Sequence, residues 1–145
     1  MGRHKLTANE LALYEQNNEI PPSDDIGEYS VALGSEVIAS GIYSFSSGEY
    51  TKAINNHSHA EGYNTIASGA YSHAEGDSVN ESGNRSHAEG GDTTASGNRS
   101  HAEGEGTTAS GNCSHAEGDH TIATGEGSHA EGGKTQKVTS ISYNN

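Results

Sequence analysis

Small and polar residues alternate along most of the chain in a pattern that returns every fourteen residues. The stretch Ser-His-Ala-Glu-Gly begins at Ser58 and occurs five more times at that interval. A weaker echo, Ser/Thr-x-Ala-x-Gly, follows seven residues after each start, as residues 93–97 follow residues 86–90. Alternation with period two is typical of β-strands, and a short fixed period is typical of a solenoid whose units bury a core only by stacking. The pattern therefore predicts an all-β fold, a narrow parallel β-roll with one coil per unit.

The frame extends upstream of the strict motif. Small residues at the first and third places predict two strands per unit, and Gly followed by two residues such as Asn84 and Arg85 predicts tight turns. At ~4.8 Å per coil, about eight coils would form a rod of roughly 40 Å. The expected interior of one unit is Ser86, Ala88, Thr93 and Ala95. The units start at Ser30, Ser44, Ser58, Ser72, Ser86, Ser100, Ser114 and Ser128.

Three positions break the pattern. Glu81 and Lys137 fall where Ala is expected inside the roll, and Asn55 replaces a turn Gly. A carboxylate at an interior position predicts a β-bulge or a re-aimed strand at Glu81, and we interpret Lys137 as the end of the roll. The residues expected to cover the last coil are Val138, Ile141 and Tyr143.

The first residues of the chain do not repeat. Thr7-Ala8-Asn9-Glu10 has the pattern of a helix capping box and predicts a short helix from about residue 8 to residue 18, before Pro21 and Pro22. We therefore expect three parts: residues 1–29 as an anchoring or nucleating helix and lead-in, residues 30–143 as the roll, and residues 144–145 as a tail.

The composition excludes several classes of protein. Only 29% of residues are apolar, too few for the core of an ordinary globule. Disorder fits the low hydrophobicity, but a disordered chain has no need to keep Gly in strict register. A net charge of -13 argues against nucleic acid as a partner, and the absence of a long apolar run argues against membrane insertion. A lone Cys113 allows no intrachain disulfide.

If Ser and Ala point inward, the second and fourth residues of each unit point outward. These two rows stay constant, whereas the outward row of the second strand varies from Ile66 to Asn80 to Thr94. A constant surface predicts a periodic partner, the simplest being further copies of the same rod arranged as a homotrimer. The rows would then form a hydrogen-bonded ladder along the axis, preceded by an apolar plug. The ladder residues are His59, Glu61, His73, Glu75, His87, Glu89, His101, Glu103, His115, Glu117, His129 and Glu131, and the plug residues are Val31, Leu33 and Phe45.

The stretch Ser30-Val31-Ala32-Leu33-Gly34 and its echoes resemble the YadA-like head repeat of trimeric autotransporter adhesins, over about residues 30–132. The resemblance implies a left-handed parallel β-roll that forms a homotrimer. In that family the places of Val31 and Leu33 face the trimer axis, which implies the same for the His and Glu rows. The Ser-His-Ala-Glu-Gly variant is also similar to repeats in fibre proteins of phages and of prophages of Gram-positive bacteria.

Two chemical interpretations compete with the ladder. Rings of three His could hold Zn, Ni or Fe, but six identical rings exceed what a dedicated metal site needs, so we expect neither a metal nor another cofactor. Ser58 next to His59 suggests a nucleophile and its base, but neighbours in a strand point to opposite faces. We therefore expect no catalytic residue and no enzyme activity.

Two further functions of solenoids fit the sequence less well. Ice binding is suggested by Thr94 and Thr108, but Lys52, Asn80 and Gln136 in the same outward row break a flat lattice of Thr. Calcium-binding rolls need Asp-bearing, Gly-rich turns, which these short turns lack.

We therefore expect a structural and adhesive trimeric fibre or spike module. The preferred location is the surface of a phage virion, in a head or tail fibre. The alternative is the head of an extracellular adhesin on a cell or spore surface. Residues 1–29 would bind the virion or cell-surface scaffold, and the candidate ligands are a host receptor and a surface glycan.

Overall fold

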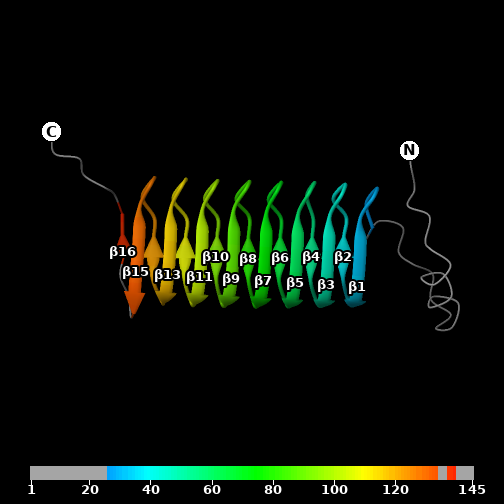
Figure 1. Cartoon of the computed structure of the whole chain (residues 1–145), viewed down its shortest axis with the longest axis horizontal. Helices are drawn as coiled ribbons and strands as arrows, with labels where there is room; N and C mark the ends of the chain where they lie inside the picture. Colours follow the sequence, from blue (N-terminus) through cyan, green and yellow to red (C-terminus); the bar gives the residue numbers. More distant parts are fainter. Residues whose placement is uncertain (1–25, 134–136, 140–145) are drawn as a thin grey trace, which may run out of the picture.

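The computed structural model describes residues 26–133 and 137–139. In this part of the chain, short strands alternate between two parallel sheets of eight strands each, so that the chain makes about seven complete turns (Figure 1). Figure 1 shows successive coils stacked side by side along one long axis. The predicted parallel β-roll is therefore confirmed.

The first sheet contains the longer strands, each of five residues. They pair in chain order, with every residue opposite the one fourteen positions later, as His101 is opposite His115. Their bounds are β1 (Val31–Ser35), β3 (Phe45–Glu49), β5 (His59–Tyr63), β7 (His73–Asp77), β9 (His87–Gly91), β11 (His101–Glu105), β13 (His115–Asp119) and β15 (His129–Gly133).

The second sheet contains strands of only two residues, shorter than the repeat pattern predicts. The Ser at the start of each unit also lies outside its strand. In most units its side chain closes the preceding turn, as the Ser86 hydroxyl does by donating to the Gly83 carbonyl at 2.6 Å. The bounds are β2 (Ile38–Ala39), β4 (Lys52–Ala53), β6 (Ile66–Ala67), β8 (Asn80–Glu81), β10 (Thr94–Ala95), β12 (Thr108–Ala109), β14 (Ile122–Ala123) and β16 (Lys137–Val138).

The interior contains small side chains, as the pattern predicts. Ser86, Ala88, Thr93 and Ala95 are each at most 3% exposed. Backbone approach between coils is equally close, since a Cβ on Gly83 would lie 2.0 Å from the carbonyl oxygen of the next coil. The roll therefore depends on close stacking of backbones, with a core made almost entirely of Ala, Ser and Thr.

The expected bulge at Glu81 is wrong. Glu81 pairs in regular register with Ala67 and Ala95, and its side chain is 0% exposed inside the roll. The carboxyl group fits because the backbone N–H of Gly69 in the neighbouring coil donates to Oε2 at 3.4 Å. A polar partner inside the roll thus replaces the predicted distortion.

The interior position expected for Lys137 is also wrong. β16 is offset from β14 by fifteen residues, so that Val138 and not Lys137 lies opposite Ala123. Val138 packs against the core. One additional residue in the last coil explains the shift, and it brings an apolar side chain to the interior position.

The described chain enters the roll through a short lead-in. Ile26 forms a bridge with Ala39, and the N–H of Gly27 donates to the Ala39 carbonyl at 2.7 Å. The predicted helix over residues 8–18 lies outside the described residues, as do Ile141, Tyr143 and the tail. The described part of the chain contains no helix, and hence none long and apolar enough to cross a membrane.

Candidate functional site

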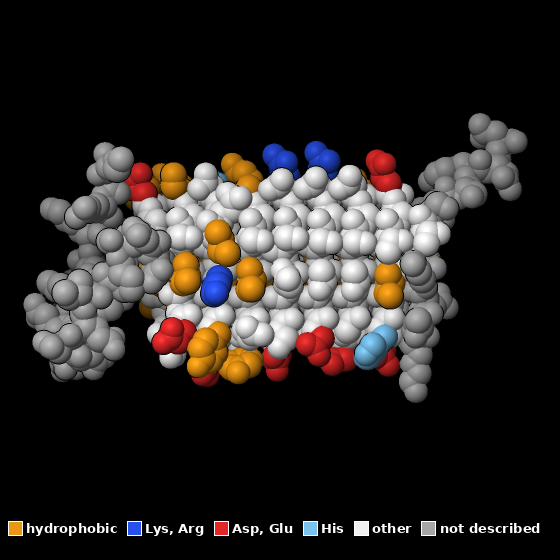
Figure 2. Space-filling model, turned by 180° about the vertical axis from the view of Figure 1, so that it is seen from behind, with side chains coloured by type: hydrophobic (Ala, Val, Ile, Leu, Met, Phe, Trp, Pro, Cys, Tyr) orange, Lys and Arg blue, Asp and Glu red, His pale blue; other side chains and the backbone are white. Residues whose placement is uncertain are grey.

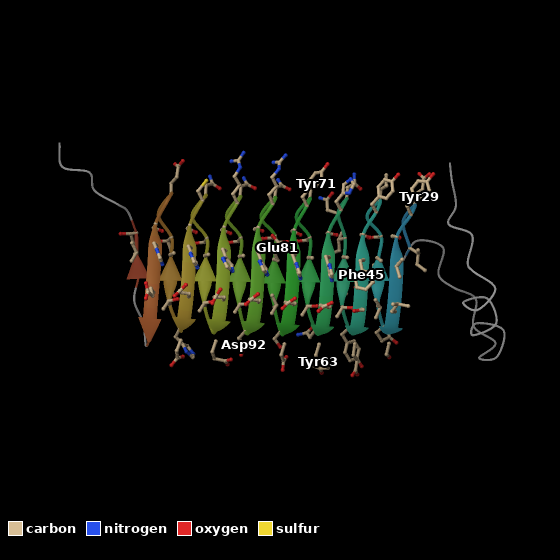
Figure 3. All side chains as sticks on the ribbon, in the orientation of Figure 1. Tyr29, Phe45, Tyr63, Tyr71, Glu81 and Asp92 are labelled. Carbon is tan, nitrogen blue, oxygen red and sulfur yellow. The ribbon has the colours of Figure 1, made fainter. Side chains whose placement is uncertain are left out.

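The outward side of the first sheet carries a column of histidine rings (Figure 3). In-register pairing places one His at the start of each strand of the first sheet from β5 to β15. Neighbouring rings lie nearly parallel, with centroids 4.4 to 4.9 Å apart. The stacking follows from the fixed coil length, because equal spacing superimposes identical residues. The rings involved are those of His59, His73, His87, His101, His115 and His129.

A column of glutamates runs beside the histidines, two residues further along each strand. Residues two apart in a strand share a face, so each Glu is within reach of the His of its own coil. Nε2 of His73 lies 3.1 Å from Oε2 of Glu75, the shortest of these distances, and the longest is 3.9 Å in the last pair. The pairs are His59–Glu61, His73–Glu75, His87–Glu89, His101–Glu103, His115–Glu117 and His129–Glu131.

The histidine column is only partly satisfied within one chain. The Nε2 atoms of His87, His101 and His115 are shielded from solvent and have no hydrogen-bond partner among the described residues. Burial and the neighbouring rings of His101 and His129 lower the pKa of His115, while Glu117 and Glu103 oppose this effect. The His115 imidazole therefore favours the neutral form and retains hydrogen-bonding capacity for a partner.

The same two columns begin with apolar residues. Val31 and Phe45 precede His59 in register, and Leu33 precedes Ser47 and Glu61. Leu33 is 51% exposed in the single chain, and the ring of Phe45 contacts that of His59 edge-on, with a centroid distance of 4.8 Å. The plug and the ladder are therefore one continuous outward face, which we call the ladder face. That three chains meet on this face stays a prediction.

The family model for the YadA head domain repeat matches this chain in two copies, over residues 60–78, 88–114 and 116–133. The roll contains YadA head repeats. A comparison with curated proteins finds no match. The match covers coils that carry the ladder face, and it agrees with the parallel roll of the structure. The matched coils are thus similar to a structural module of the adhesin-head type.

The sides of the YadA head repeats differ in composition. Figure 2 views the roll from behind, where the side chains over the middle of the sheet are mostly small and uncharged, with a few hydrophobic ones and one basic one. Ile38, Lys52, Ile66 and Asn80 succeed one another in register along this second sheet. The constant row is thus confined to the first sheet.

The head repeats bring possible metal ligands together, but in an unsuitable orientation. Donor atoms of His101, Glu103 and His115 lie within 4.8 Å of one another, as do those of His115, Glu117 and His129. Nitrogen ligands of zinc lie about 2.0–2.1 Å from the ion, along the ring lone pair. Because the stacked rings are nearly parallel, with centroids 4.7 and 4.8 Å apart, their lone pairs lie in separate, nearly parallel planes and do not converge on one ion. Within one chain, the geometry therefore favours His–Glu contacts over a metal site.

Ser58 and His59 lie as strand alternation predicts. The Ser58 hydroxyl is buried and donates to the Asn55 carbonyl at 2.6 Å, whereas the His59 ring belongs to the ladder face. These two side chains therefore form no nucleophile–base pair.

Sequence reasoning missed a second column, at the turn that precedes each unit. Tyr29, Tyr43, His57 and Tyr71 stack face to face with centroids 4.7 to 5.2 Å apart, and the guanidinium of Arg85 lies 5.6 Å from the Tyr71 ring centroid. Figure 3 shows Tyr29 and Tyr71 on one edge of the roll and Tyr63 on the opposite edge. The sequence contained a signal for this column, because each of these residues immediately precedes the Ser that begins the next unit.

An asparagine ladder supports the same turn. The side-chain oxygen of Asn98 accepts the backbone N–H of Asn84 at 3.0 Å, and Asn112 does the same for Asn98. Asn56 and Asn84 accept in the same way from the backbone of the preceding coil. These bonds join successive coils outside the two sheets.

Proposed function

We propose that this chain is a homotrimeric fibre or spike module whose ladder face lies at the trimer axis. The observation that carries the proposal is the contrast between the sheets: six coils repeat His and Glu on the first sheet, while the outward row of the second sheet varies. A face exposed only to water tolerates variation, whereas a face that contacts a periodic partner has to repeat.

The hydrogen bonding of the ladder face supports a partner of the same kind. His side chains from β5 to β13 are 35–39% exposed, and three of their Nε2 atoms have no hydrogen-bond partner among the described residues. Three copies around an axis would bring three His and three Glu to each level. A glutamate of a second copy could then accept from these nitrogens without any change in the fold.

The mass of the assembly and a face-specific disruption test this proposal. Light scattering should give about 45 kDa for a trimer of the 15.0 kDa chain. The double variant His87→Asp with His101→Asp should dissociate it, because six additional carboxylates would gather at the axis. The matched control, Ser96→Asp with Ser110→Asp, alters exposed residues outside the ladder face and should stay trimeric. A monomeric wild-type chain would overturn the proposal.

We place the module on a phage virion, with residues 1–29 as its anchor. The similarity of the Ser-His-Ala-Glu-Gly repeat to phage and prophage fibre repeats supports this location, and the adhesin-type head repeats support an adhesive function. We propose no catalytic activity. Antibodies to the roll should detect it on virions banded in a density gradient. Detection on cells or spores instead, with virions unlabelled, would favour the surface-adhesin alternative.

The anchoring segment has a separate test. A chain lacking residues 1–22 should keep the roll and the trimer, since the described lead-in begins at Ile26, but should no longer assemble onto virions. Incorporation at the wild-type level would show that residues 1–22 are not the anchor.

A further inference from the structure

The repetition of the ladder face creates an ambiguity in assembly. From β5 to β15 each coil presents the same His and Glu, and adjacent coils differ by one constant step of fourteen residues. If one copy slides along another by a whole coil, His levels still meet His levels. Compared with the aligned trimer, a slip of one coil loses only the His and Glu contacts of the one terminal coil that no longer has a neighbour. The ladder alone therefore favours the correct alignment only weakly.

The first two coils remove this equivalence. β1 presents Val31 and Leu33 on the ladder face, and β3 presents Phe45 and Ser47 at the same places. Val31 and Leu33 are 36% and 51% exposed in the single chain, although large apolar side chains gain free energy by leaving water. No equivalent apolar pair occurs in the ladder coils that follow, from β5 to β15.

A slip of one coil would juxtapose unlike groups at the start of the axis. Phe45 of one copy would meet Val31 or His59 of the next, and Ser47 would meet Leu33 or Glu61. A slip of two coils would press Leu33 against the Glu61 carboxylate, which loses water without gaining a hydrogen bond. In the aligned trimer, each apolar side chain instead meets its own counterparts.

We infer that Val31, Leu33 and Phe45 set the axial register of the trimer, with the same residues of two further copies of this chain as their occupants. This inference rests on the proposed homotrimer. The plug selects one alignment among several that the ladder would accept, as a single distinct layer can fix the register of a repetitive coiled coil.

Spin-label distances between coils report the register. Cys113 is the sole cysteine and is exposed, so one chain is labelled there. A second chain carries Cys113→Ser and Tyr43→Cys, five coils earlier on the same edge. Both are mixed with excess unlabelled Cys113→Ser chain. The two labels are about 24 Å apart along the axis when aligned, and each one-coil slip changes this component by ~4.8 Å.

The wild-type plug should give one narrow distance distribution between the two labels. The variant Val31→His, Leu33→Glu, Phe45→His and Ser47→Glu extends the ladder to the first coils. It should remain trimeric by light scattering and show several populations displaced by ~4.8 Å axial steps. A matched control, Ile42→His with Ile54→Glu, replaces apolar residues that are 40% and 45% exposed outside the ladder face and should keep one population.

The outcomes separate this inference from the proposed function. A monomeric wild-type chain overturns both. If the four-residue variant is trimeric and gives a single distance between the labels, the register inference alone is overturned. If that variant folds but no longer forms a trimer, the register inference is also overturned, because the plug would then contribute to the affinity between chains and not to their register. A milder variant, Val31→Ser with Leu33→Ser and Phe45→Ser, removes all three plug side chains without adding charge, guards against misfolding and should show one-coil slips. A single population in that variant contradicts the inference as well.

Discussion

The buried carboxyl of Glu81 makes a sharp prediction about pH and stability. Burial raises its pKa from 4.5 to about 8, although hydrogen bonds from Ser72 and from the backbone of Gly69 and Gly83 act in the opposite direction. Its Oε1 atom has no hydrogen-bond partner that meets normal geometry. In the folded chain the group is therefore neutral at pH 7, whereas in the unfolded chain it is ionised.

The sign of the effect follows from proton uptake. Between pH 4.5 and about pH 8 the folded chain binds one proton that the unfolded chain has released, so the free energy of unfolding falls as the pH rises. The slope is about 1.4 kcal/mol per pH unit, which amounts to about 3 kcal/mol at pH 7 and about 5 kcal/mol above pH 8. The full stability is present below pH 4.5.

Glu81→Gln isolates this contribution, because the amide keeps the shape and never ionises. Guanidinium denaturation of wild-type and variant chains at equal concentration, at several pH values from 4.5 to 8.5, should show the variant gaining relative stability as the pH rises. The exposed control Glu126→Gln should show no such trend. A difference between Glu81→Gln and wild type that is independent of pH would refute the burial argument.

Three other predictions concern the ladder face and the coil stacking. Acidification from pH 7 to pH 4 should lower the melting temperature of the Glu81→Gln trimer. The pKa of His115 is lowered in the folded chain, so the unfolded chain takes up a proton at a higher pH than the folded chain does. A melting temperature that does not change with pH would contradict the assignment of the ladder face to the trimer axis. Gly83→Ala should abolish or severely weaken folding by circular dichroism, since its Cβ would lie 2.0 Å from the Gly97 carbonyl oxygen. Gly133→Ala, with nothing within 4 Å, is the control and should fold normally. Finally, chain purified without a metal column should contain less than one metal ion per trimer, and a chelator should leave its melting temperature unchanged. Stoichiometric metal whose removal lowers stability would contradict the expectation that the histidines of the ladder face hold no metal.

Most of the architecture was predictable because the coil length is constant. Equal spacing sets the register, so residues fourteen positions apart, such as Ala88 and Ala102, share a place in the roll. Alternation then assigns Ala inward and His outward. The interior residues, the ladder face and the apolar start of the columns all follow from these two rules.

The strand bounds and the exceptions depended on contacts between coils. Ser86 begins its unit in the sequence but closes a turn in the structure, because its hydroxyl donates to the carbonyl of Gly83. Glu81 stays inside because the Gly69 N–H of a neighbouring coil meets it there. The residues next to Glu81 in the sequence predict neither this hydrogen-bond partner nor the raised pKa.

The period, the fold class and the composition of each face can be read from the order of residues, because they depend only on spacing and residue size. Two features emerge in the folded roll alone: Val138 replaces Lys137 opposite Ala123, and Tyr43, His57 and Tyr71 stack along one edge. The physical reason is that burial and stacking are properties of neighbouring coils. The sequence repeat shows which residues recur, and the packing of one coil on the next determines which residues are in contact.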